Sequence, residues 1–189
     1  MVTEEGLMTD ETTEDGDGNG VINLEPGTQA VAKVPAMEDP LCHLPPEAFD
    51  GLLLICTRGD PSAVEEVVLG SGADPSRVLV VPVTGTSLRY DGPLRVADRT
   101  APSDMTKVGV NFAEGLSEID DEGGWVFVNN FNVFLMYADE NTVYRFMNSL
   151  TNETRQAGAR GVYCTVRDAI GDTTYEKFRQ LCDTEIDLR

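Results

Sequence analysis

The 189-residue chain is long enough for one domain of ordinary size with a real hydrophobic core. Its 33 aspartates and glutamates outnumber its 14 lysines and arginines, which gives a net charge of −19. This balance, with no run of basic residues, argues against nucleic-acid binding, because affinity for a phosphate backbone comes largely from clustered Lys and Arg.

The basic residues are unevenly chosen, with only three lysines, Lys33, Lys107 and Lys177. Heavy acidity with few lysines is typical of a surface that stays hydrated in concentrated salt, where screening also weakens self-repulsion. We therefore expect a cytoplasmic protein of a halophilic archaeon. The alternative is an acidic protein from an ordinary organism with an acidic tail.

Cysteine usage and hydropathy are consistent with that location. The four cysteines form no CxxC pair, and Cys56 and Cys164 stand in apolar runs, where they are expected to be small buried hydrophobes. The acidic N-terminus is unlike a signal peptide, and every apolar run is too short for a membrane span. We expect reduced thiols and no membrane span.

The chain divides into a tail and a domain. Residues 1–40 are expected to form an acidic N-terminal tail, and residues 41–189 the folded domain. The stretch from Thr9 to Gly20 is almost entirely polar and acidic, which predicts disorder. The mildly apolar segment from Thr28 to Ala36 is expected to pack as an arm.

From Phe49 onward the sequence alternates between strand-like and helix-like segments. Continuous apolar runs predict buried strands at 52–56, 78–81, 125–128 and 162–166, with a short strand near 94–96 and a final one at 184–188. Helices are predicted between them, starting at Pro61, after Ser103, after Asp139 and after Asp172; Asp60, Asp139 and Asp172 are the expected N-caps. This rhythm predicts an α/β fold, a three-layer αβα sandwich with a mainly parallel sheet.

Ligands of such sheets bind at the carboxyl ends of the strands, so the turns after Cys56 and Val128 are the places to examine. A phosphate cradle needs the pattern GxxxxGK[ST], but the turn after Cys56 has one glycine, Gly59, and no lysine. Asp60 puts negative charge where a phosphate would bind, and its main expected role is to cap the helix.

The strand at 125–128 ends in Asn129 and Asn130. A phosphate-hydrolysing enzyme of this architecture has an acidic residue there to hold magnesium, and a neutral amide is a much poorer ligand. The structural alternative is that both asparagines bond the backbone of the turn.

The segment from Phe127 to Tyr137 resembles the Walker B strand and following segment of RecA/KaiC-type ATPases, with Asn129 where that family has aspartate. The segment from Ser103 to Val110 is similar to one common in haloarchaeal KaiC-like proteins. The resemblance covers roughly residues 49–189 and implies a RecA-like core that lacks Walker A and the Walker B aspartate. It implies a vestigial nucleotide pocket, formed by Thr57, Arg58, Gly59, Asp60, Asn129 and Asn130, and no ATP hydrolysis.

Other chemistry has little support. His43 is the only histidine, which leaves little room for a zinc cluster or a Ser-His-Asp triad, and its neighbour Cys42 is not expected to pair with it in an extended chain. We therefore predict no catalytic residue, no metal and no cofactor.

The leading hypothesis is a non-catalytic regulatory or interaction protein that binds another protein, such as a related intact ATPase or a second copy of itself. The main alternative is a sensor domain that binds a nucleotide or small polar effector without hydrolysis, through Arg58 and Asn129. An enzyme with an unrecognised site and an acidic mimic of nucleic acid are the remaining alternatives.

Overall fold

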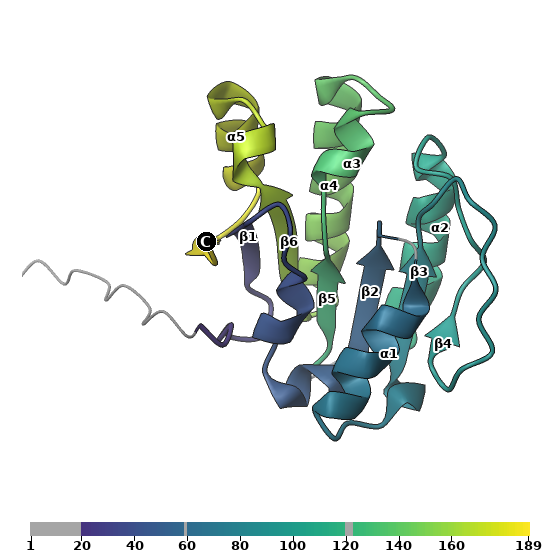
Figure 1. The fold of residues 1–189 in the computed structure, drawn as a ribbon. Helices are drawn as coiled ribbons and strands as arrows, with labels where there is room; N and C mark the ends of the chain where they lie inside the picture. The colour runs from purple at the N-terminus through teal and green to yellow at the C-terminus, as the bar shows by residue number, and fades with distance from the viewer. Residues whose placement is uncertain (1–19, 59, 120–122) are drawn as a thin grey trace, which may run out of the picture.

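A computed structural model describes residues 20–58, 60–119 and 123–189 of the chain. Its centre is one seven-stranded sheet with the order β4-β3-β2-β5-β6-β1-β7, in which every described pairing is parallel (Figure 1). The strands are β1 (Gln29–Val34), β2 (Leu52–Cys56), β3 (Val78–Pro82), β4 (Arg95–Val96), β5 (Trp125–Val128), β6 (Arg160–Val166) and β7 (Thr184–Asp187).

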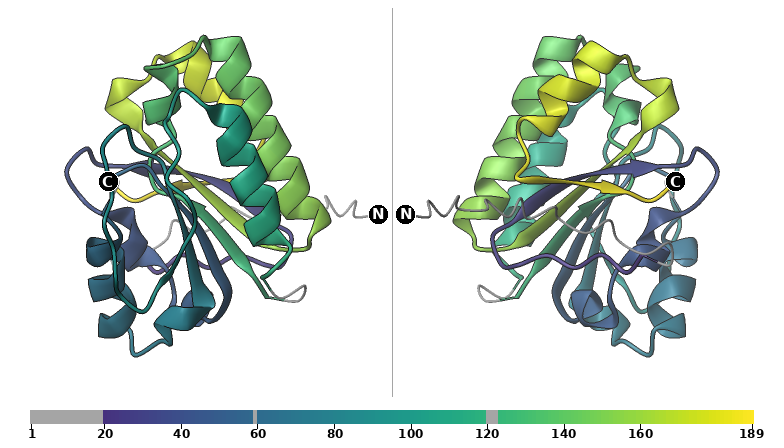
Figure 2. Two further views of the ribbon diagram at one scale, coloured as in Figure 1. Left: turned by 90° about the vertical axis from the view of Figure 1, so that its right-hand side faces the viewer. Right: turned by 90° about the vertical axis from the view of Figure 1, so that its left-hand side faces the viewer.

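Helices cover both faces of the sheet, as the two edge-on views in Figure 2 show. One face carries α1 (Pro61–Gly70) and the short helices η1 (Pro40–His43) and η2 (Pro46–Gly51). The other carries α2 (Met105–Leu116), α3 (Asn132–Leu135), α4 (Glu140–Gln156) and α5 (Asp172–Arg179). Two further single turns are η3 (Pro75–Arg77) and η4 (Arg167–Ala169). The predicted three-layer α/β architecture is therefore confirmed.

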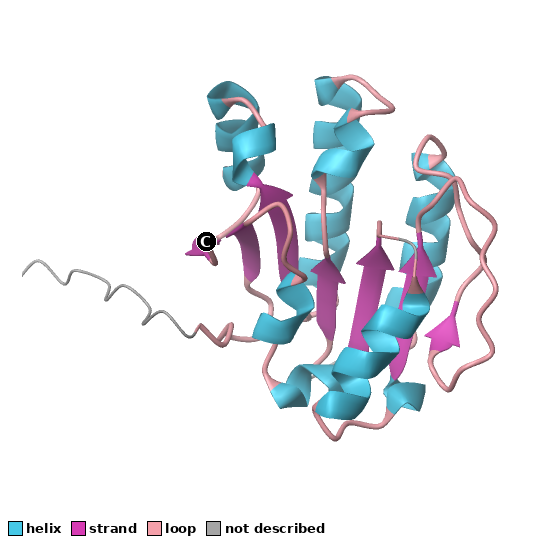
Figure 3. Ribbon diagram, viewed as in Figure 1, coloured by secondary structure: helices cyan, strands magenta, loops and turns pink. Residues whose placement is uncertain are grey.

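The buried strands explain why the sheet is covered on both sides. All five residues of β2 are buried, and their side chains alternate between the two faces. Leu52, Leu54 and Cys56 contribute to the core under α1, whereas Leu53 and Ile55 contribute to the core under α2 and α4. Between β3 and α2 the chain is mostly loop with the short β4, as predicted (Figure 3).

The segment predicted to pack as an arm is a strand inside the sheet. β1 lies between β6 and β7, with Ala30 paired to residues on both. Its polar Gln29 is fully buried, and hydrogen bonds satisfy its side-chain amide there. The amide donates to the Ala159 carbonyl at 3.1 Å and accepts from the Tyr163 hydroxyl at 3.0 Å. The expected boundary of the domain at residue 40 is therefore wrong, since the domain includes β1. Residues 9–19, where disorder was expected, lie outside the described residues.

Two of the three predicted helix caps are confirmed. Asp60 accepts a hydrogen bond from the Ser62 amide at 2.9 Å, and Asp139 accepts one from the Thr142 amide at 3.0 Å. The third is wrong, because Gly171 is the N-cap of α5 and Asp172 is its first residue.

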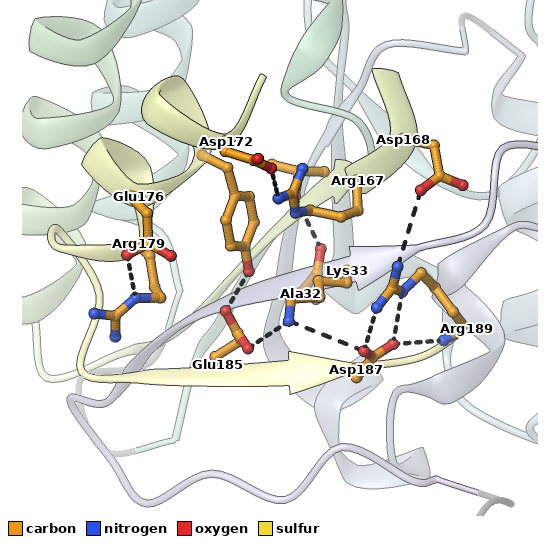
Figure 4. Close-up of polar contacts among 12 residues, drawn as sticks. Ala32, Lys33, Arg167, Asp168, Asp172, Glu176, Arg179, Glu185, Asp187 and Arg189 are labelled. Atoms are coloured by element: carbon orange, nitrogen blue, oxygen red, sulfur yellow. Dashed lines mark hydrogen bonds and ion pairs between the residues drawn. The ribbon is translucent and has the colours of Figure 1, made fainter. Parts of the chain in front are cut away.

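Charged side chains hold the edge strand β7 against β1 and α5 (Figure 4). Lys33 of β1 forms an ion pair with Glu185 at 2.6 Å and lies 4.0 Å from Asp187. Arg189 pairs with Asp187 at 2.7 Å and holds the pKa of that carboxyl at about 2. These contacts fix the C-terminal strand mainly through polar groups.

Within the described residues, no helix is both long and apolar enough to cross a membrane. No disulfide joins the four cysteines, which all lie in the described part of the chain, and Cys56 and Cys164 are buried as predicted.

Candidate functional site

The chain reverses its direction across the sheet between β2 and β5. From β2 it proceeds through α1 to β3 on one side, and from β5 through α4 to β6 on the other. In open parallel sheets, ligands bind beyond the carboxyl ends of the strands at such a switch point. The two predicted turns, after β2 and after β5, therefore meet at the position where a ligand is expected.

Asn129 joins these two turns. Its side-chain oxygen accepts hydrogen bonds from the Thr57 amide and the Thr57 hydroxyl, both at 2.9 Å. Its side-chain nitrogen lies 3.9 Å from the sulfur of Cys56, and the residue is only 4% exposed. The Asn129 side-chain amide therefore closes the β2 turn.

Asn130 has a similar local role. Its side-chain oxygen accepts from the Asn132 amide at 3.1 Å, and its carbonyl accepts from the Thr57 hydroxyl at 3.3 Å. Asn132 in turn bonds both the amide and the carbonyl of Val166, at 3.0 Å each. The asparagines thus bond the turn backbone, as the structural alternative predicted.

An aspartate followed by proline closes the turn after each of the first two strands. Asp60 caps α1, and Asp39 caps η1 by accepting from the Leu41 amide at 3.1 Å. The following residues, Pro40 and Pro61, have no amide hydrogen to donate. Each turn therefore offers a carboxylate and reduced donor capacity where a phosphate would need free N–H groups.

The sequence of neither turn matches a phosphate cradle. The turn after β1 runs from Pro35 to Asp39 and contains neither glycine nor lysine, and it leads into a single 3₁₀ turn. The turn after β2 passes through Gly59, which lies outside the described residues, and α1 already begins at Pro61. Neither has the sequence GxxxxGK[ST] that wraps phosphates.

A cavity of about 230 Å³ lies between these turns. Its polar lining is Asp39, Arg58, Asp60 and Asn129, and its apolar lining is Leu41, Leu54, Cys56, Ala63 and Val64. Arg58 donates to the carbonyl of Glu38 at 2.8 Å, which ties the β2 turn to the segment after β1. The cavity can accept a small polar molecule, but two carboxylates at its rim oppose an anion.

Five of the six predicted pocket residues meet at this edge of the sheet: Thr57, Arg58, Asp60, Asn129 and Asn130. Asp39 was missed because residues 1–40 were assigned to the tail, and Leu41, the first residue of the expected domain, was missed as well. The signal that could have found them is Asp39-Pro40, the same pair of residues as Asp60-Pro61.

The other two kinds of site considered from the sequence are a metal-binding cluster and a Cys42–His43 pair, and neither is formed by the residues that the structure describes. No group of three or more His, Cys, Asp or Glu side chains there could hold a metal ion. Cys42 donates to the Asp39 carbonyl at 3.1 Å, whereas His43 bonds the Gly20 carbonyl at 3.0 Å. Partial burial and the nearby Asp39 raise the pKa of the Cys42 thiol, which opposes its use as a nucleophile.

A sequence model of the family of unknown function DUF7504 matches residues 10–188. The chain belongs to this family. No curated protein matches the DUF7504 chain.

The DUF7504 chain is similar to a solved structure from Pyrococcus horikoshii OT3, described as a structural study of Project ID PH0250. The TM-score is 0.56 at 10% identity, over 88% of this chain and 84% of the other. At that identity the likeness extends to the fold alone.

Proposed function

We propose that this protein is a non-catalytic regulatory or interaction protein on a degenerate RecA/KaiC-like ATPase scaffold, in the cytoplasm of a halophilic archaeon. The observation that carries the proposal is the Asn129–Thr57 contact at the switch point. The position where the ATPase family has its magnesium-binding carboxylate holds an amide, and that amide is bonded to the neighbouring turn. Asp39 and Asp60 add negative charge at the rim, where transferring phosphates would need cations.

Exposed apolar side chains support a protein partner. Met37 is 91% exposed in the segment after β1, and Met136 and Tyr137 are 78% and 53% exposed after α3. Both segments belong to connections that leave the carboxyl ends of strands, β1 and β5. Exposed methionine and aromatic side chains are common at protein-binding surfaces, because they adapt to different partners and bury large apolar area. The partner is a related intact ATPase or a second copy of the chain.

The catalytic half of the proposal is tested by ATP turnover and MgATP binding of the purified protein in molar KCl. We expect turnover no higher than in the buffer, and no thermal shift at millimolar MgATP. Asn129→Ala is compared with Asn141→Ala, an exposed position on α4. Turnover that Asn129→Ala abolishes and Asn141→Ala preserves would show an active ATPase and refute the proposal.

The interaction half is tested by light scattering at the same salt, alone and with intact RecA/KaiC-type ATPases from the same organism. We expect a species larger than the 20.5 kDa chain, and we expect Met136→Asp to weaken the affinity of that association at least tenfold. The control is Leu69→Asp, which places the same charge at an exposed leucine on α1. A monomer under every condition, or equal weakening by both variants, contradicts the proposal.

A second candidate is a sensor domain that binds a small polar effector without hydrolysis. It is favoured by the 230 Å³ cavity, in which Arg58 and Asn129 meet an apolar wall. A thermal-shift screen of nucleotides and small polar metabolites in high salt tests it, with Arg58→Ala as the variant expected to lose the shift. The absence of any shift at millimolar concentration rules this candidate out.

A further inference from the structure

Two carboxylates line the cavity of about 230 Å³ between the β1 and β2 turns, which we call the switch-point cavity. Each uses one oxygen to cap a helix: Asp39 accepts from the Leu41 amide at 3.1 Å, and Asp60 accepts from the Ser62 amide at 2.9 Å. Among the described residues, no donor bonds the second oxygen of either carboxylate. Each carboxylate therefore keeps the capacity to accept a hydrogen bond from a bound molecule.

The basic side chains of the protein do not pair with these two carboxylates. All 14 lysines and arginines and the single histidine lie in the described ranges. Within those ranges, none of their ion pairs of 4.0 Å or less joins Asp39 or Asp60. A cavity partly excludes water, so salt screens the attraction of its carboxylates for a cation less than at an open surface. This side of the cavity therefore favours a positively charged group of a ligand.

Two hydrogen-bond donors line the same cavity, Asn129 and Arg58. Asn129 is only 4% exposed, and both of its bonds from Thr57 end on the side-chain oxygen. For its nitrogen, the described residues provide one acceptor, the Cys56 sulfur at 3.9 Å, which is a weak one. Arg58 uses one of its five N–H donors for the Glu38 carbonyl at 2.8 Å. An amide and a guanidinium in one cavity suit a ligand carboxylate.

The rest of the lining is apolar. It consists of Leu41, Leu54, Cys56, Ala63 and Val64. An apolar wall with a few polar groups is typical of a site for an organic molecule, and it suits the aliphatic part of such a ligand better than a hydrated metal ion. The volume of about 230 Å³ lies below the roughly 300–1,000 Å³ of sites for drug-sized ligands, so the ligand is small.

We propose that the switch-point cavity binds a free α-amino acid with an aliphatic side chain. The ammonium group of the ligand pairs with Asp39 and Asp60, its carboxylate accepts from Arg58 and Asn129, and its side chain packs on the apolar wall. A zwitterion satisfies both kinds of polar group, whereas an amine leaves the donors unused and an anion faces two carboxylates. This inference rests on the second candidate function, the small-effector sensor, and names the chemical class of its effector.

Isothermal titration calorimetry of the full-length chain in about 1 M KCl tests the proposal with L-leucine and two analogues of similar shape. Isoamylamine lacks the carboxylate, and isocaproate lacks the ammonium group. We expect L-leucine to bind at least tenfold more tightly than either analogue, because a site built for a polar group rejects a ligand that lacks it. Glycine should also bind at least tenfold more weakly, because it lacks the aliphatic part.

Matched variants separate binding from folding. Asp39→Asn and Asp60→Asn each remove one negative charge and keep an N-cap of similar strength, so both variants should fold. Each should weaken the binding of L-leucine at least tenfold, whereas Asp139→Asn, the same change at the cap of α4, should leave it unchanged. Arg58→Ala should weaken it to a similar extent, and Arg145→Ala at an exposed position of α4 should not.

The outcomes distinguish this proposal from the candidate function on which it rests. If an analogue or a nucleotide binds as tightly as L-leucine, the amino-acid assignment is overturned and the sensor candidate stands. If no ligand gives heat or a thermal shift at millimolar concentration, both are overturned. Equal weakening by Asp60→Asn and Asp139→Asn places the binding elsewhere and also overturns the proposal. The turnover and light-scattering tests of the regulatory or interaction protein are independent of these results.

Discussion

The assignment of Asn129 as a structural residue can be tested by replacing it with alanine. The substitution removes the acceptor of two hydrogen bonds from Thr57, and leaves the backbone amide of a half-buried turn without its partner. An unsatisfied donor costs about 1–3 kcal/mol, and partial access of water at Thr57 lowers that cost. The lost bond to the hydroxyl and the small cavity add to it, so we expect a loss of about 2–3 kcal/mol.

For a chain of this length, each kcal/mol changes the melting temperature by roughly 2–4 °C, so the expected decrease is about 4–12 °C. Thr57→Val is the partner variant, because it removes the hydroxyl and keeps the backbone donor, at a cost of about 1 kcal/mol. Chemical unfolding of both single variants and the double variant completes a double-mutant cycle. We expect a coupling energy of about 0.5–3 kcal/mol, because the two side chains are in direct contact.

The result that refutes the reasoning is a stability of Asn129→Ala within about 0.5 kcal/mol of the unsubstituted chain, a change typical of an ordinary surface position. The Asn129 amide would then be dispensable for the turn and available for a ligand. The same purified variants serve in the ATP assay, so structural and catalytic roles are separated on one set of proteins.

Three further predictions follow from the described contacts. Gly115→Ala should destabilise the fold by about 1–2 kcal/mol in chemical unfolding, because its Cβ would lie 2.7 Å from a leucine methyl of β2, and overpacking outweighs the gain in helix propensity. Gly109→Ala on the same helix meets only an ordinary 3.8 Å contact and should stabilise by about 0.5–1 kcal/mol; the reverse order contradicts the packing of α2. Arg189 lowers the folded-state pKa of Asp187 to about 2, so the stabilisation by this ion pair is present above pH 3.8 and is lost as the pH falls towards 2. Asp187→Asn should therefore reduce the pH dependence of the melting temperature between pH 3.8 and 2. An unchanged slope in that range refutes the role of the pair. Cys42 is the exposed thiol and should react first with a thiol reagent in the native state. Cys42→Ser should therefore remove the first labelled species. If that species persists in the variant, another thiol is the more accessible one and the prediction is wrong.

The sequence predicted most of the architecture, because the buried strands from Leu52 onward are continuous apolar runs. It failed at β1, where Gln29 and Lys33 interrupt the apolar pattern. Both are accommodated only by distant partners: Gln29 by Ala159 and Tyr163, and Lys33 by Glu185 of β7. More than 100 residues separate each pair, so no local pattern could reveal that this segment is a strand.

The candidate site was predicted where the residues carry their own local signal. Asp60 before Pro61 marks a helix start, and the amides after β5 mark the end of a strand. The contact between Asn129 and Thr57 depends on β2 and β5 being neighbours, which sequence spacing does not show. Asp39 was missed for the same reason that β1 was missed.

The caps at the candidate site occupy backbone donors that a phosphate could bind. A helix N-terminus leaves several backbone donors unpaired, and a phosphate is one way to satisfy them. Here Asp39 and Asp60 satisfy donors at the start of η1 and α1, and the prolines after them remove one donor from each. An aspartate cap contributes about 1 kcal/mol of stability, so replacing either one to admit an anion would destabilise the apo protein. The two caps thus satisfy backbone donors that a phosphate would otherwise bind, which supports the proposal of a scaffold retained for binding another protein.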